Sequence, residues 1–105
     1  MIIYVDIDET ICETPVSRDY SLAVPIQKNI EKINNLYSEG NHIVYWTARG
    51  TGSGIDWSRI TKEQLVRWGA RYHHVRFQKP EYDLFICDKA VNSIEFFKKS
   101  KKVAR

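Results

Sequence analysis

Short apolar runs alternate along the chain with segments in which apolar residues recur at helical spacing. The runs are rich in β-branched and aromatic residues and predict buried strands over residues 2–7, 43–46, 72–77 and 82–87. The helical spacing predicts three helices, and these extend from Pro25 to the stop at Gly40, over the stretch before Gly69, and over residues 90–99. For the second helix, Thr61 begins a capping-box sequence with Gln64, and Ser58 is an alternative cap.

The elements follow the order β-α-β-α-β-β-α. Alternating strands and helices of this length predict a parallel sheet covered on both faces, a small Rossmann-like three-layer α/β/α fold. A length of 105 residues predicts one domain. Ligands of such folds bind at the carboxyl ends of the strands, so the residues that follow each strand are the candidates for chemistry.

The formal net charge of +3 is unevenly distributed. Residues 98–105 carry five basic side chains, which leaves 11 basic and 13 acidic side chains in residues 1–97. We therefore expect a slightly acidic domain over residues 1–97 and a solvated basic tail over residues 98–105. This balance, without a basic stripe lined by aromatic residues, argues against nucleic acid as the partner.

The N-terminus and the cysteines indicate the compartment. The first six residues turn acidic at Asp6, which is unlike a signal peptide, and no apolar run approaches the ~20 residues that span a bilayer. Cys12 and Cys87 lie far apart and form neither a CxxC pair nor a disulfide framework, so free thiols are expected. A cytoplasmic protein without membrane contact is the prediction.

Polar residues with matching chemistry follow several of the predicted strands. Asp6 and Asp8 end the first strand and share a face in extended chain, where two carboxylates repel each other unless a cation lies between them. A divalent ion with oxygen ligands, Mg²⁺ above all, fits such a pair together with substrate phosphate oxygens. A lone D-x-D is often only a turn former. Its weight increases because Thr47, Lys79 and Asp88 complete a phosphate-and-metal set.

Taken together and in order, these residues resemble the four motifs of the haloacid dehalogenase superfamily of phosphohydrolases. The first motif, an apolar strand followed by D-x-D-x-T, is matched by Ile3 to Thr10, and the second, a strand ending in Thr, by Ile43 to Thr47. Lys79-Pro80 matches the third motif, and Phe85 to Asn92 matches the fourth in its D-x-x-x-N form. The resemblance extends over residues 3–92, with one departure: Cys87 stands where many relatives have a first acid.

The resemblance implies a role for each matching residue. Asp6 is the nucleophile that forms an aspartyl-phosphate, and Asp8 is the general acid and then the general base. Thr47 and Lys79 hold phosphoryl oxygens, and Lys79 also orients Asp6. A Mg²⁺ cofactor is bound by Asp6, Asp8, Asp88 and Asn92. Thr10 and Arg49 are the expected substrate-binding residues, Arg49 because it lies beside Thr47 and can contact a phosphate or a carboxylate.

Chain length bears on the substrate. Larger members of the superfamily insert a cap domain after the first motif or between the second and third. Residues 11–24 are too few for one, and residues 48–78 already hold a loop, a helix and a predicted strand, so a member without a cap is expected. A second, narrower resemblance is to the short phosphatases of capsular polysaccharide biosynthesis, carried by Thr47-Ala-Arg-Gly50, the stretch from Trp57 to Gly69 and Lys79-Pro80. It implies a small phosphorylated metabolite, a sugar or polyol phosphate, as the substrate. Small capless relatives are often oligomers, which leaves a homo-oligomer, dimer or tetramer, open.

Three other functions remain open. A two-component receiver domain also combines clustered acids, a Thr and a Lys, although here Thr47 and not an Asp ends the second strand. A catalytically weak binding module of the same fold is the second alternative, with the basic tail contacting a partner. The third is a nucleotide or nucleic-acid 3′-phosphatase, since T-A-R after the second motif occurs there too.

Overall fold

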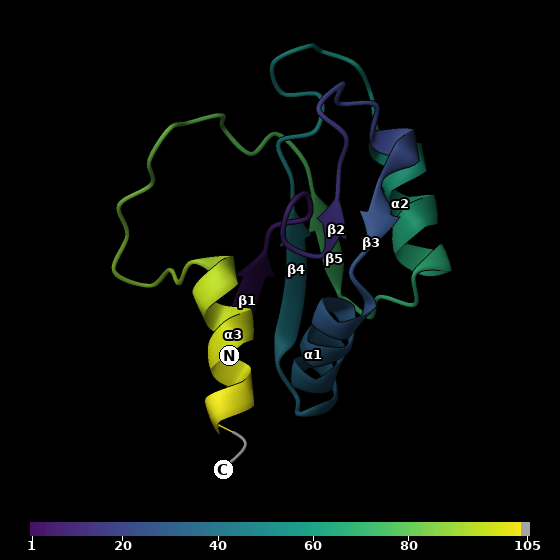
Figure 1. Ribbon diagram of the computed structural model, residues 1–105. Coiled ribbons are helices and arrows are strands. Elements are labelled where there is room, and N and C mark those ends of the chain that lie inside the picture. The colour runs from purple at the N-terminus through teal and green to yellow at the C-terminus, as the bar shows by residue number, and fades with distance from the viewer. Residues whose placement is uncertain (104–105) are drawn as a thin grey trace.

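A three-stranded parallel sheet forms the centre of the protein in the computed structural model, which describes residues 1–103 and the side chains of residues 1–98. Its order is β1-β4-β5, with bounds Ile2–Val5, His42–Trp46 and His74–Arg76. Ile3 lies opposite Ile43, and Val44 lies opposite His74. The middle strand is the most buried, which agrees with its continuous apolar run (Figure 1). The predicted small α/β fold with a parallel sheet is confirmed.

Three helices accompany the sheet: α1 (Gln27–Ser38), α2 (Ser58–Arg67) and α3 (Ser93–Val103). The first joins β1 to β4 and the second joins β4 to β5, as expected of parallel strands linked by crossovers. Ile30 and Ile33 of α1 and Leu65 of α2 are buried in the core. They pack in one cluster with residues of the strands, of the segment after β1 and of the end of α2, namely Val5, Ile7, Ile11, Ile43, Tyr45 and Trp68.

The starts of two helices differ from the prediction. Pro25 does not begin α1 but belongs to β3 (Val24–Pro25), which pairs antiparallel with β2 (Cys12–Glu13). The helix α2 begins at Ser58, whose backbone N–H donates to the Asp56 side chain, so neither Thr61 nor Ser58 is the cap. Thr61 is instead fully buried in the second turn, where it contacts the functional site.

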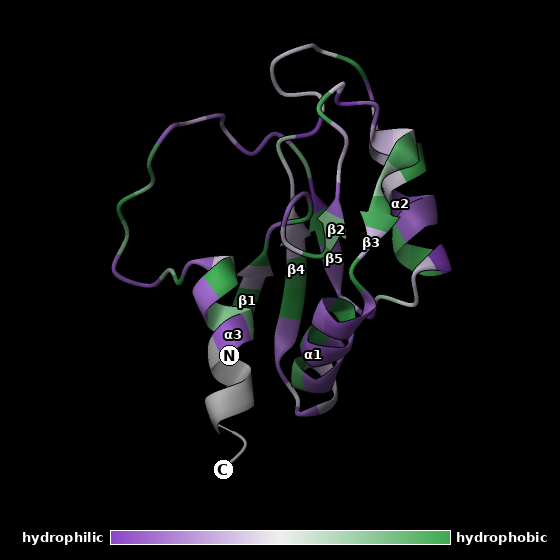
Figure 2. Ribbon diagram, viewed as in Figure 1, coloured by the Kyte–Doolittle hydropathy of each residue, from purple (hydrophilic) through white to green (hydrophobic). Residues whose placement is uncertain are grey.

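The predicted strand over residues 82–87 is wrong. This segment has no regular structure and belongs to the long loop that arcs away from the sheet before α3 (Figure 1). Leu84, Phe85 and Ile86 are 75%, 56% and 87% exposed, and Cys87, expected inside a strand, is exposed too. They form part of a hydrophobic stretch in this loop (Figure 2). An apolar run favours a strand only where its backbone finds a partner, and the outer edge of β1 has no strand partner in the described part of the chain.

The boundary predicted between domain and tail falls inside α3. The backbone of this helix continues to Val103, so residues 98–103 of the predicted tail belong to α3. Arg105 lies outside the described residues. Residues 11–24, one place for a cap domain, hold β2, a 3-10 turn (Tyr20–Leu22) and the start of β3, and residues 48–78, the other, hold a loop, α2 and β5. No helix within residues 1–103 is long and apolar enough to cross a membrane.

Candidate functional site

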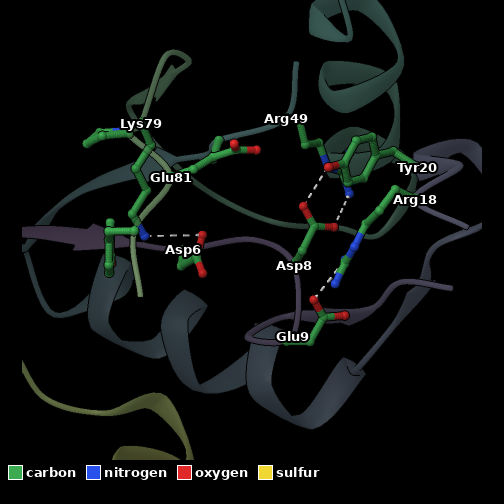
Figure 3. Close-up of a pocket in the computed structure, with 11 residues that line it drawn as sticks. Asp6, Asp8, Glu9, Arg18, Tyr20, Arg49, Lys79 and Glu81 are labelled. Carbon is green, nitrogen blue, oxygen red and sulfur yellow. Dashed lines mark hydrogen bonds and ion pairs between the residues drawn. The ribbon is translucent and has the colours of Figure 1, made fainter. Parts of the chain in front are cut away.

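A pocket of about 470 Å³ opens at the carboxyl ends of β1 and β4. Parallel strands bring their ends to the same edge of the sheet, and here residues far apart in the sequence converge (Figure 3). The lining is dominated by charged side chains, from the loops after β1, β4 and β5 and from the segment between β2 and β3: Asp6, Asp8, Glu9, Arg18, Tyr20, Ala48, Arg49, Lys79, Pro80, Glu81 and Tyr82. Four of the predicted site residues, Asp6, Asp8, Arg49 and Lys79, are among them.

Asp6 faces Lys79 across this pocket. The Lys79 ammonium lies 3.5 Å from Oδ1 of Asp6, and the Asp6 side chain remains 41% exposed. The same ammonium lies 5.8 Å from the ring centre of Trp46 and 5.7 Å from that of Tyr82, within cation–π range. One carboxylate oxygen is therefore held by a cation while the group stays open to a ligand.

Backbone hydrogen bonds fix the position of Lys79. Its N–H donates to the carbonyl of Thr47 at 3.1 Å, and its carbonyl accepts from the Thr51 hydroxyl at 2.9 Å. Thr47 itself is only 1% exposed and lies behind the pocket wall, where its hydroxyl oxygen accepts from the Arg49 N–H at 3.1 Å. Hydrogen bonds from the loop after β4 thus hold the backbone of Lys79, which lies in the loop after β5, at the site.

Asp8 has a different cation, Arg49. Nε of Arg49 donates to Oδ2 of Asp8 at 3.0 Å, and Nη2 donates to Oδ1 at 2.9 Å, which is a two-bond carboxylate–guanidinium pair. The hydroxyl of Thr14 and the thiol of Cys12 also donate to Oδ1. The repulsion between the two carboxylates, which suggested a metal from the sequence, is countered in the structure by one basic side chain for each.

These environments shift the pKa values of the Asp6 and Asp8 carboxyl groups in opposite directions. Burial raises the pKa of Asp6 above its ordinary value, and Lys79 opposes this rise only in part. The pKa of Asp8 is also raised by burial, but the hydrogen bonds and charge of Arg49, with help from Thr14, outweigh that effect and lower it overall. Asp8 is consequently held in the ionised form, which suits a proton acceptor better than a proton donor.

The turn after Asp8 shapes the near wall of the site. Glu9 takes a left-handed conformation with φ of 60°, and the N–H groups of Thr10 and Ile11 both donate to the carbonyl of Ile7. Thr10, expected to bind substrate, is 8% exposed and is not among the residues that line the pocket. Its carbonyl accepts from the Asn29 side chain of α1, so its observed contacts hold the turn against that helix.

The remaining predicted metal ligands lie apart from the pocket. Asp88 is 84% exposed on its side chain and pairs with Lys89, while the Asn92 side chain accepts from the N–H of Ile94 at the start of α3. Among the residues described, no group of three His, Cys, Asp or Glu side chains is placed to hold a metal ion. Because Asp88 and Asn92 have their contacts outside the pocket, the residues as arranged do not bring the four expected magnesium ligands together.

Several pocket residues escaped the sequence analysis because they belong to none of the motifs. Arg18 forms an exposed ion pair with Glu9 at 3.0 Å, and the Tyr20 ring stacks over the Arg49 guanidinium. Glu81 points into the same space (Figure 3), and Tyr82 borders it. Glu81 follows directly after Lys79-Pro80, so its proximity to a known motif is the one signal that pointed to it.

Comparison with known proteins adds the fold but no activity. No protein-family model matches the chain, and a search of curated proteins finds no match. Among solved structures, the chain is similar to a crystal structure of a structural-genomics target from Vibrio cholerae. The two are 27% identical, the match covers 91% of this chain and 86% of that one, and the TM-score is 0.80. This similarity supports the α/β fold over nearly the whole chain.

Proposed function

We propose that this protein hydrolyses a small phosphomonoester through an aspartyl-phosphate on Asp6, as its resemblance to haloacid dehalogenase phosphatases implies. The observation that carries the proposal is the arrangement at the ends of β1 and β4. A partly exposed carboxylate, Asp6, lies 3.5 Å from the Lys79 ammonium in an open pocket, and a second carboxylate, Asp8, follows two residues later. A cytoplasmic sugar or polyol phosphatase is the finer form of the proposal.

The reaction has two displacements. In the first, an Asp6 oxygen attacks phosphorus, the bond from phosphorus to the leaving oxygen breaks, and that oxygen takes a proton from Asp8, which must first gain one because its lowered pKa favours the ionised form. In the second, water attacks the same phosphorus, the bond to Asp6 breaks, and Asp8 accepts the proton from water. The lowered pKa of Asp8 favours the second of these roles. Lys79 opposes the negative charge that accumulates between the phosphoryl group and Asp6.

Magnesium remains part of the proposal only through the resemblance. Because the arranged side chains do not fit the expected ligand set, each step above is written on the chain's own residues. A phosphatase assay is therefore run both with Mg²⁺ and with a chelator.

The test compares two variants that differ in one atom from the wild-type side chain. Asp6→Asn removes the nucleophilic charge but keeps the shape, and it should lower phosphate release from sugar phosphates and p-nitrophenyl phosphate by at least about a thousandfold. Asp56→Asn is the matched control, since the Asp56 side chain accepts a hydrogen bond from the Ser58 N–H outside the pocket, and it should retain the wild-type rate. Release of no phosphate by the wild-type protein from any substrate would refute the proposal.

A further inference from the structure

Arg49 is the most buried charged side chain of the site. Its side chain is fully inaccessible, and each nitrogen of its guanidinium donates a hydrogen bond within the protein. Two nitrogens bind the Asp8 carboxylate, and the third, Nη1, donates to the Thr61 hydroxyl at 3.0 Å and to the Gln64 side-chain oxygen at 2.7 Å. A substrate group would have to displace one of these partners to bind Arg49.

The helix α2 anchors the guanidinium from behind. Thr61 and Gln64 are buried, one helical turn apart on the same face. The Gln64 side chain also donates to the backbone carbonyl of Tyr20 at 2.6 Å, and the Tyr20 ring lies 4.8 Å from the guanidinium. Arg49 is thus held on both sides by groups that do not themselves reach Asp8.

Two parallel hydrogen bonds fix the plane of a carboxylate, whereas a single bond leaves it free to rotate. Burying a guanidinium and a carboxylate is expensive, and a pair of apolar residues of similar size often gives equal or greater stability. Stability alone is therefore a poor reason for this arrangement. Orientation of Asp8 toward the pocket is the property that an apolar pair would not supply.

We infer that Arg49 is a positioning residue that, anchored by Thr61 and Gln64 of α2, holds the Asp8 carboxylate in a single orientation for proton transfer. The inference replaces the substrate-binding role expected for Arg49, and its catalytic consequence rests on the proposed function. A group that only orients Asp8 acts on the chemical step and not on binding, so the two roles separate in kcat and KM.

The kinetic test uses near-isosteric changes. Arg49→Lys keeps the charge but loses the paired hydrogen bonds, and Thr61→Val removes one anchor. We expect kcat for p-nitrophenyl phosphate to fall about 10- to 100-fold in Arg49→Lys and by less in Thr61→Val, with KM within about twofold of wild type. The kcat of Arg49→Met should be lower than that of Arg49→Lys, because the charge retained by lysine partly replaces arginine. Glu63→Gln, an exposed position on α2, is the matched control and should match wild type.

A rise in KM at unchanged kcat would overturn the inference and restore a substrate-binding role for Arg49. A second readout needs no activity: the unfolding free energies of Asp8→Asn, Arg49→Met and the double variant. If the residues are coupled, the double variant loses clearly less stability than the sum of the two single losses, whereas additive losses contradict the pairing. If the wild type releases no phosphate, the proposed function fails, and this cycle still decides whether Arg49 and Asp8 form the coupled pair. A folded Thr61→Val protein covers the case in which Arg49→Met does not fold.

Discussion

Residues 2–7 and residues 82–87 have the same kind of sequence, a short apolar run that leads into aspartate, and they adopt different structures. The first forms β1, pairs with β4 and delivers Asp6 and Asp8 to the pocket. The second pairs with no strand in the described structure and leaves Asp88 exposed. The difference teaches that an apolar run is only a necessary condition for a strand: backbone groups must also find partners, and the position of a catalytic side chain follows from that pairing.

Amide exchange should show the largest difference, between the sheet that residues 2–5 join and the irregular run 82–87. Amides of Ile43 and Tyr45 lie in the middle strand of the sheet, whereas those of Leu84 and Phe85 belong to irregular, exposed chain. Exchange monitored by NMR should be slower in the strand by at least about a thousandfold, because it requires unfolding of the core. Comparable protection of residues 84–87 would mean that they form a strand, for which the free edge of β1 is the available place.

The reactivities of the two cysteines compare a buried position near the first run, Cys12, with an exposed position in the second, Cys87. Burial raises the pKa of Cys12 to about 12, so at pH 8 about one molecule in ten thousand carries the reactive thiolate at this position, and this fraction grows as the pH rises toward 12. Cys87 is exposed. Iodoacetamide at pH 8 should therefore label Cys87 at least about a hundredfold faster than Cys12, as followed by peptide mass spectrometry. Equal rates would break the contrast.

A matched pair of isoleucines compares the packing of the two runs. Ile7 is fully buried and Ile86 is 87% exposed. Ile7→Ala should lower the free energy of unfolding by about 2–5 kcal/mol because it leaves a cavity in the core. Ile86→Ala should change it by less than about 0.5 kcal/mol. Urea titrations measure both, and a loss for Ile86→Ala as large as that for Ile7→Ala would show that the second run is packed.

Histidines at the opposite end of the sheet should give the smallest effect. The His42 ring stacks on His73 at 4.3 Å and lies 5.2 Å from His74. Partial burial and these neighbours lower the pKa of His42, so the folded protein disfavours its protonated form. Its contribution to stability is therefore complete above the ordinary pKa of about 6.5 and is lost as the pH falls below that value. The free energy of unfolding, measured by urea titration at several pH values, should therefore fall less steeply between pH 7 and 5 in His42→Gln than in the wild type. An equally steep fall in the variant would contradict the prediction.

Sequence patterns predicted the parts of the fold that depend on local and continuous signals. The strands around residues 2–5 and 42–46 and the helix α1 follow the predicted apolar periodicity closely. The patterns also placed Asp6, Asp8 and Lys79 at strand or loop ends that converge. They failed where a contact partner decides the outcome, as for residues 82–87, whose side chains are suitable for a strand but whose backbone has no partner.

The direction of side chains was the second feature that sequence patterns could not predict. Thr61 and Gln64 have the spacing of a capping box, yet both point inward and accept hydrogen bonds from Arg49. Arg49 stands beside Thr47, which suggested contact with a phosphate, yet its guanidinium turns to Asp8. Residues that are three apart on a helix share a face in either case, so spacing alone does not distinguish a helix cap from a buried anchor.

The central claim, that Asp6 is the nucleophile, is tested most directly by trapping the covalent intermediate. Protein mixed with a ³²P-labelled phosphomonoester is quenched in acid within milliseconds, digested, and mapped by mass spectrometry. Label is expected on the peptide that contains Asp6; hydroxylamine should release it, as it does an acyl-phosphate, and Asp6→Asn should carry none. Label on another residue, or phosphate release by Asp6→Asn at the wild-type rate, would contradict it.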